Sequence, residues 1–167
     1  IEERSILECQ SNTGESAFAL NDLVIKESEN RGLIRLKVKS EQRLISEYHC
    51  DGLIFATPTG STAYNLSAGG PIISPNVEAI AMTPICPHTL GNRSVIFDSK
   101  THIEVLFDNL PEAPLVSIDG KKYFEKESLI SIKIQLAKRR FPLIHNKANT
   151  HFSIVRDKLN WGDPTVR

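Results

Sequence analysis

The chain has 167 residues, enough for one domain with a sizeable core or for two very small ones. Its formal net charge is +0, so no excess of positive charge points to nucleic acid or to an anionic membrane as a partner. The three cysteines are too few and too scattered for a disulfide framework, which favours a reducing, cytoplasmic setting. No run is long and apolar enough to cross a bilayer.

The first residues are Ile-Glu-Glu-Arg, and Met82 is the only methionine. We therefore expect the chain to be part of a longer polypeptide. We find no internal repeat, linker or low-complexity tract, so residues 1–167 are expected to form a single domain.

Short runs rich in β-branched and aromatic residues dominate the chain and predict β-strands. In chain order the predicted strands cover residues 18–25, 33–38, 52–56, 94–97, 103–107, 115–118 and 129–136. The runs 33–38 and 129–136 alternate in polarity, which is typical of antiparallel strands that are buried on one side. Turn residues separate the runs at 30–32, 108–111 and 119–120.

Helical patterns are few. A short helix is expected to open at Ser61 or Thr62, because Ser and Thr are good N-caps. A second is expected over residues 151–159, where Phe152, Val155 and Leu159 share one face. Many strands with one or two short helices predict an all-β fold, an antiparallel β-sandwich, and not a series of βαβ units.

Residues 57–71 read TPTGSTAYNLSAGGP, two small-residue turns around one aromatic residue. A Gly-Ser-Thr turn that leads into a helix leaves backbone N–H groups unpaired, and these suit an anion or a polar ligand edge. Gly60 allows close approach of the backbone, and Tyr64 offers a flat face for a base. Taken alone, however, the composition favours a plain capped helix in a connecting loop over a ligand site.

A longer string decides the question. DGLIFATPTGSTAYNLSAGGPI, with ALNDLVI upstream and ICPHTLGNRSVIF downstream, resembles the carboxy-terminal domain of NAD kinases, and SIDGKKY fits the family's late hairpin more loosely. The resemblance runs from about Phe18 to near Trp161. It implies a β-sandwich, the carboxy-terminal domain of a two-domain enzyme. That enzyme phosphorylates the 2′-hydroxyl of the adenosine ribose of NAD with ATP or polyphosphate and gives NADP.

The resemblance also implies a set of NAD-binding residues. Asn21 and Asp22 stand where the family has an Asn-Glu pair that holds the adenosine half of NAD. An Asn carboxamide can bond an adenine edge in two places, and a carboxylate can accept hydrogen bonds from a ribose diol. Asp22 is one methylene shorter than the usual Glu, which affects its ribose contact.

The family's Thr-Ala-Tyr-x-x-Ser segment implies a pocket for adenine and ribose with Tyr64 at its wall. The residues expected around it are Thr59, Thr62, Ala63, Tyr64, Asn65, Leu66 and Ser67. Asp51 matches an acid that reaches the nicotinamide end, often across a subunit boundary, although its position in Asp-Gly alone favours a turn residue. His49 and Lys121 replace the Arg and Gln of many relatives and are two further candidates.

The family's Gly-Gly-Asp-Gly motif, which carries the catalytic acid, belongs to an amino-terminal α/β domain and does not occur in this sequence. We therefore expect no catalytic residue here, and weak NAD binding without turnover by this chain alone. The reaction needs Mg²⁺ with ATP. No metal site is expected in this chain, since His49, Cys50 and Asp51 would alternate across a strand. The expected partners are the α/β domain and further copies of the chain, in a homodimer or homotetramer.

Two other classes of protein are alternatives to an NAD kinase domain. The first is a non-catalytic nucleotide-binding or assembly module. The second is the second domain of a diacylglycerol- or sphingosine-type lipid kinase, which shares the architecture. A lipid kinase is not expected to carry Thr-Ala-Tyr-x-x-Ser together with Asn-Asp, so the two motifs argue against the last reading.

Overall fold

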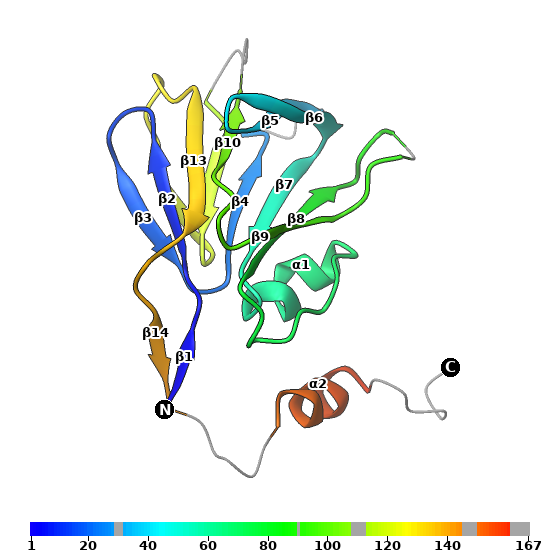
Figure 1. Cartoon of the computed structure of the whole chain (residues 1–167). Coiled ribbons are helices and arrows are strands. Elements are labelled where there is room, and N and C mark those ends of the chain that lie inside the picture. The colour runs from blue at the N-terminus through cyan, green and yellow to red at the C-terminus, as the bar shows by residue number, and fades with distance from the viewer. Residues whose placement is uncertain (29–31, 90, 108–112, 145–149, 161–167) are drawn as a thin grey trace.

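The computed structural model describes residues 1–28, 32–89, 91–107, 113–144 and 150–160. Its main body consists of two six-stranded antiparallel sheets packed face to face (Figure 1). The first sheet has the order β3 (Ser16–Ala19), β2 (Leu7–Ser11), β13 (Ser131–Leu136), β10 (Ile103–Leu106), β5 (Ile34–Ser40) and β6 (Arg43–Cys50). The second has the order β12 (Lys121–Tyr123), β11 (Leu115–Ile118), β4 (Asp22–Lys26), β7 (Gly52–Ala56), β8 (Ala79–Ile85) and β9 (Val95–Asp98).

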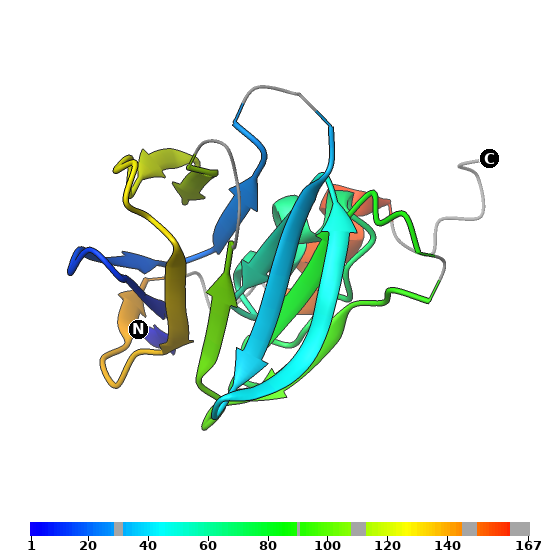
Figure 2. The ribbon, with the colours of Figure 1, turned by 90° about the horizontal axis from the view of Figure 1, so that it is seen from above.

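The smaller elements lie at the margins of this body. A two-stranded ribbon of β1 (Glu2–Arg4) and β14 (Phe141–Leu143) extends from the sheets toward α2 (His151–Leu159) (Figure 1). Seen from above, the β5–β6 hairpin lies beside β10, as the pairing requires (Figure 2). The 3₁₀ turn η1 (Gly60–Thr62) and α1 (Tyr64–Ser67) follow β7. No helix in the described ranges has the length and apolar composition needed to cross a bilayer.

The inner faces of both sheets share one hydrophobic core. Alternate residues of β5, such as Leu36 and Val38, point inward, and they meet side chains such as Leu53 and Phe55 from β7. All of these four are at most 1% exposed. Burial of such aliphatic and aromatic surface is the main force that holds two sheets together.

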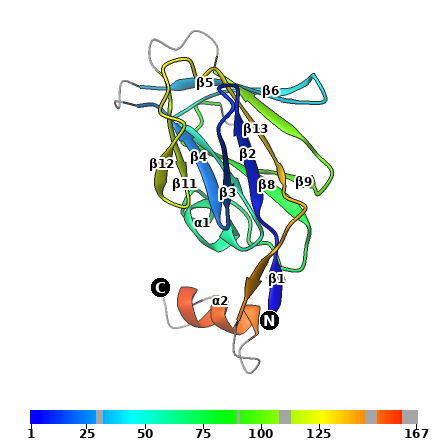
Figure 3. The ribbon, with the colours of Figure 1, turned by 90° about the vertical axis from the view of Figure 1, so that its left-hand side faces the viewer.

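The 57–73 segment covers the outer face of the second sheet. A smaller apolar cluster of Val24, Ile54, Ala56, Ala81 and Ile73 fills the space between that face and the segment. This is why every residue of β7 is buried, on both sides of the sheet. The same packing fixes α1 beside β4 and β11, as Figure 3 shows.

The all-β sandwich with short helices is confirmed. The predicted strands 52–56 and 115–118 are β7 and β11, and those at 33–38, 94–97, 103–107 and 129–136 are shifted by one or two residues at their ends. The single strand predicted over 18–25 was wrong. It is two strands, β3 and β4, because Leu20 and Asn21 cross from one sheet to the other. Of the turns expected at 30–32 and 108–111, residues 30–31 and 108–111 lie outside the described residues.

Several strands were not predicted. β8 is buried over nearly its whole length and so has no alternating pattern, and β2 and β6 carry charged residues among few apolar ones. The short strands β1, β12 and β14 were missed as well.

The helix predictions had mixed outcomes. The helix over 151–159 is α2, and the Thr150 hydroxyl accepts a hydrogen bond from the N–H of Ser153 as its N-cap. The proposed cap at Ser61 or Thr62 was wrong, since α1 starts after Ala63 with no side-chain cap bond. The Ser61 hydroxyl instead donates to the Pro58 carbonyl oxygen at 2.7 Å and accepts from the Ile73 N–H at 3.0 Å. The Ser61 hydroxyl therefore links the start of the 57–73 segment to its end.

Candidate functional site

A cavity of about 390 Å³ lies on the outer face of the β4–β11 ladder. Side chains alternate along a strand, so Asp22, Val24 and Lys26 of β4 point to the same side. The antiparallel register sets Ser117 beside Val24 and Leu115 beside Lys26. The cavity lining consists of Asn21, Asp22, Val24, Lys26, Ala63, Tyr64, Leu115, Ser117, Asp119 and Gly120. The structure thus brings the two sequence motifs, Asn21–Asp22 and Ala63–Tyr64, to one place.

Thr57 and Gly60 hold the two motifs against each other. The Thr57 hydroxyl donates to the Leu20 carbonyl oxygen at 2.6 Å and accepts from the Gly60 N–H at 3.0 Å. The Thr57 N–H donates to the Asn21 carbonyl oxygen at 2.9 Å. A Cβ atom on Gly60 would lie 2.0 Å from that same oxygen, so only glycine fits there. The absence of a side chain at Gly60 therefore allows the turn to contact the backbone of Asn21.

Asp119 is a residue of the cavity that the sequence reading missed. Its carboxylate accepts hydrogen bonds from the backbone N–H groups of Leu20, Asn21 and Asp22, at 2.8, 2.8 and 3.1 Å. Its own N–H donates to the Asp22 carbonyl oxygen at 3.0 Å. The sequence around Asp119 predicts only an Asp-Gly turn, because the N–H groups that bond to its carboxylate lie 97 to 99 residues earlier in the chain.

The carboxyl group of Asp22 is buried near the Asp119 carboxylate. Burial, and to a lesser degree the nearby Asp119 charge, raise its pKa to about 6, against the lowering effect of a hydrogen bond from the Tyr64 backbone N–H. A carboxyl group with this pKa can accept hydrogen bonds as an anion just above pH 6 and donate one below it.

Tyr64 forms the wall of the cavity together with Lys26. The Lys26 ammonium donates to the Tyr64 hydroxyl at 2.7 Å and lies 4.5 Å from the centre of its ring. A cation over an aromatic face is an attractive contact that orders both side chains. Lys26 follows directly after the ALNDLVI motif, and nothing in the sequence reading singled it out.

Asn65 serves packing in this structure. It is fully buried, its amide nitrogen donates to the Ser61 and Pro71 carbonyl oxygens, and its amide oxygen accepts from the Thr83 hydroxyl at 2.7 Å. A Cβ on Gly70 would lie 2.2 Å from that amide oxygen, so Gly70 makes room for Asn65. The Asn65 side chain thus stabilises the 57–71 segment by hydrogen bonds to residues on both sides of α1.

The other predicted residues of the segment surround the cavity without lining it. Thr59 and Thr62 are partly buried, and the Thr62 hydroxyl donates to the Thr59 carbonyl oxygen at 3.4 Å. Leu66 is partly buried and Ser67 is exposed.

Asp51 lies at the opposite end of the second sheet's central ladder, and His49 lies two residues before it, near the end of β6 in the first sheet. Asp22 pairs with Ala56, whereas Lys26 pairs with Gly52, which directly follows Asp51. At about 3.3 Å per residue, Asp51 stands roughly 16 Å from the Asp22 end. Asp51 is exposed, and within one chain it does not line the cavity.

Lys121 is exposed on β12, two residues beyond Asp119. It lies at the margin of the site and is not part of the lining.

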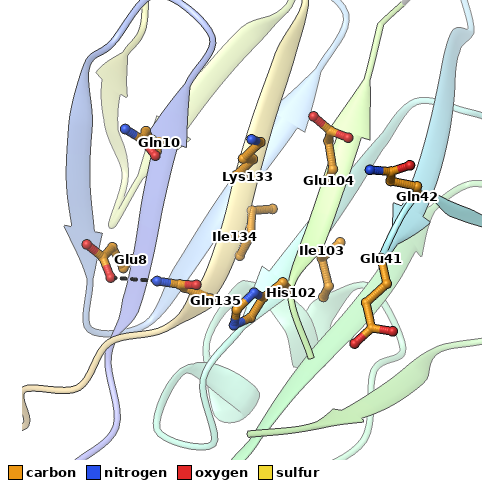
Figure 4. A pocket seen from close by; sticks show the side chains of 10 residues that line it. All are labelled: Glu8, Gln10, Glu41, Gln42, His102, Ile103, Glu104, Lys133, Ile134 and Gln135. Carbon is orange, nitrogen blue, oxygen red and sulfur yellow. Dashed lines mark hydrogen bonds between the residues drawn. The ribbon is translucent and has the colours of Figure 1, made fainter. Parts of the chain in front are cut away.

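A second cavity, of about 280 Å³, lies on the outer face of the first sheet (Figure 4). Its lining combines Glu8, Glu41 and Glu104 with Lys133 and His102, and Glu8 accepts a hydrogen bond from Gln135 at 2.9 Å. It offers no stacking wall comparable with Tyr64. Across the described ranges, no three His, Cys, Asp or Glu side chains come together as a metal site.

An antiparallel β-sandwich with a cavity that combines carboxylates, an ammonium and an aromatic wall defines a ligand-binding domain. Residues 20–146 match the family model of the ATP-NAD kinase C-terminal domain. The chain belongs to this family, as the sequence resemblance implied.

Curated relatives agree with this assignment. The chain is 36% identical over 167 residues to the NAD kinase of Geotalea daltonii, with 98% of this chain and 59% of that protein covered. It is 37% identical over 166 residues to the NAD kinase of Sulfurimonas denitrificans, with 98% and 58% covered. The chain thus spans somewhat more than half the length of these relatives.

Solved structures give the same answer. The crystal structure of yeast NADH kinase complexed with NADH has a TM-score of 0.89 and 30% identity, over 97% of this chain and 49% of that one. An NAD kinase from Archaeoglobus fulgidus in complex with ATP has a TM-score of 0.72 and 26% identity, over 83% and 53%. These findings do not favour the lipid-kinase domain or the non-catalytic module.

Proposed function

We propose that this chain is the NAD-binding domain of an NAD kinase, which transfers a phosphoryl group from ATP or polyphosphate to the 2′-hydroxyl of the adenosine ribose of NAD. The observation that carries the proposal is the cavity in which Asn21 and Asp22 meet Ala63 and Tyr64. Its chemistry suits an adenosine: an amide for the base edge, a carboxylate for the ribose diol and a ring for stacking. The NAD kinase relatives and the NADH-bound yeast structure support the choice of ligand.

Each residue of the segment has a place in this proposal. Tyr64 and Ala63 contact the nucleotide, and Thr59 and Thr62 lie within reach on the same turn. Asn65, Leu66 and Ser67 shape the pocket from behind, Asn65 through its buried hydrogen bonds. Lys121 stands at the rim.

Asp51 and His49 take part through a second copy of the chain. Because they lie roughly 16 Å along the ladder from Asp22, they reach the nicotinamide end of an NAD molecule that is bound to a partner subunit. This requires a homodimer or a homotetramer.

The chemical step needs groups that we assign to an amino-terminal α/β domain of the same polypeptide. The Gly-Gly-Asp-Gly motif there supplies the catalytic acid, and Mg²⁺ arrives with ATP. The present chain binds NAD, orients its adenosine ribose and shields it from water. Its three cysteines are free, in keeping with a reducing, cytoplasmic location.

Titration of the chain with NAD, followed by calorimetry, tests the binding role. We expect Tyr64→Ala to weaken NAD binding by about tenfold, because it removes a stacking face. The unliganded unfolding temperature should not change, since the side chain is 36% exposed. Tyr123→Ala, at 38% exposure and outside the cavity lining, is the matched control. Equal NAD affinities of parent and Tyr64→Ala would remove Tyr64 from the site.

A turnover assay tests the division of labour. The chain mixed with NAD, ATP and Mg²⁺ should form no NADP at a normal kinase rate. NADP formation at such a rate would show that the catalytic acid lies in this chain.

A further inference from the structure

The cavity carries opposite charges at its two ends. Asp22 and Asp119 lie at one end, and Lys26 lies at the other. The Cα atoms of Asp22 and Lys26 lie four residues apart on one strand, a separation of about 13 Å. Between them the floor is formed by Val24, Ser117 and Leu115, a mixture of apolar groups and one hydroxyl.

The position of Lys26 is fixed by the wall of the cavity. Its ammonium bonds to the Tyr64 hydroxyl and lies over the Tyr64 ring. Both contacts are with a neutral side chain, so neither cancels the positive charge. A lysine held in this way presents its charge at the cavity at a small further cost in side-chain entropy.

We propose that Lys26 binds a phosphate group of the nucleotide and thereby sets the direction in which the nucleotide lies. The ribose hydroxyls then face Asp22 and the phosphate faces Lys26. The reverse orientation would bring a phosphate against two carboxylates, which repel it. Lysine is a common phosphate ligand that acts as a point charge. The proposal rests on the NAD-binding role above and adds a specificity residue that the family motifs do not include.

The test compares adenosine, AMP and ADP, which differ only in phosphate content, with NAD, which adds the nicotinamide riboside. In the parent chain the phosphate-bearing ligands should bind more tightly than adenosine, and the gain should shrink as salt is added. Lys26→Gln keeps donors near Tyr64 but removes the charge. It should weaken ADP and NAD binding by about tenfold and leave adenosine binding unchanged. Lys26→Arg should retain most of the gain, and Lys138→Gln, at an exposed site outside the cavity, should change nothing.

Each remaining outcome overturns the proposal in a recognisable way. An equal loss for adenosine and NAD in Lys26→Gln would mean that Lys26 only supports Tyr64. Unchanged NAD and ADP affinities would mean that the phosphate lies elsewhere. If the parent chain binds none of the four ligands, the proposed NAD site fails first and the role of Lys26 fails with it. Unliganded unfolding temperatures of all variants, measured alongside, identify a variant that has lost its fold.

Discussion

At the scale of single residues, Asp22 combines burial and a neighbouring charge with a proposed ligand contact. The residue is 6% exposed, and its carboxyl group receives a hydrogen bond from the Tyr64 backbone N–H. Its pKa is raised from the ordinary value of about 3.8 to about 6, first by burial and then by the charge of Asp119. The folded chain therefore holds this proton more tightly than the unfolded chain does. The resulting stability is full below about pH 4 and is lost as the pH rises through about 6.

Asp22→Asn should consequently stabilise the fold above pH 6 and have little effect near pH 4. We expect the gain in the free energy of unfolding at pH 7.5 to be on the order of 2 kcal/mol. Urea unfolding at the two pH values measures it. NAD binding should weaken at pH 7.5, where Asp22 is ionised, because an amide is a poorer acceptor for ribose hydroxyls than a carboxylate, and the loss should be smaller near pH 4, where Asp22 is protonated.

Asp98→Asn provides a contrast of opposite sign. The Asp98 carboxylate is exposed, and hydrogen bonds from the Thr101 hydroxyl and the Lys100 N–H lower its pKa. Its contribution is present at neutral pH and is lost as the pH falls, so this variant should be destabilised at neutral pH. A stability gain at pH 7.5 that is the same for both variants would contradict the assignment for Asp22.

At the scale of elements, the site is held by contacts between loops. The link between β3 and β4 receives contacts from two turns. The Asp119 carboxylate accepts hydrogen bonds from its backbone N–H groups, and Thr57 and Gly60 contact its carbonyl groups. Asp119 adopts a left-handed backbone with φ 47°, a conformation that Asp tolerates better than most residues. Two turns from different parts of the chain thus set the position of Asn21 and Asp22.

Gly60→Ala tests the contact between the turn and the backbone of Asn21. Its new Cβ would meet the backbone of Asn21, with the carbonyl oxygen at 2.0 Å and the carbonyl carbon at 2.4 Å. Backbone cannot rotate away as a side chain can, so the turn must move. We expect a loss of about 1–3 kcal/mol in stability and at least a tenfold loss in NAD affinity.

Gly91→Ala is the control, because a Cβ there meets nothing within 4 Å and the backbone is not in the left-handed region. If Gly60→Ala bound NAD as well as Gly91→Ala does, the turn would not position the site. Thermal unfolding and NAD titration of both variants provide the comparison.

At the scale of the whole molecule, the sandwich separates the two groups of predicted site residues. The Asn21–Tyr64 cavity lies at one end of the β4–β7 ladder, and Asp51 and His49 lie at the other. One rigid sandwich cannot bring the two groups together. The proposed site shared between two subunits would bring the two groups together, since a closed symmetric dimer repeats each contact twice.

A complementation experiment tests the shared site. Asp51→Ala and Tyr64→Ala should each weaken NAD binding when prepared alone. If the two variant chains are unfolded, mixed and refolded together, mixed dimers should contain one intact site and one doubly defective site. High-affinity NAD binding should therefore reappear for a fraction of the sites. If the mixture binds no better than either variant, then Asp51 does not act across a subunit boundary.

The sequence by itself determined the all-β class, several strands and the family, because local polarity patterns and contiguous motifs are properties of neighbouring residues. It predicted β7, β11 and α2 to the residue. It also named Asn21, Asp22, Ala63 and Tyr64, the members of the motifs that do line the cavity.

Only the tertiary structure decided which chain segments meet. It showed the crossing between sheets at Leu20 and Asn21, and it showed β8 as a strand, which lacks a periodic pattern because it is covered on both sides. It added Asp119 and Lys26 to the site, and it placed Asn65 in the packing of the segment. Asp119 holds backbone groups 97 to 99 residues away, and a hydrogen bond over that separation leaves no trace in the residues beside it.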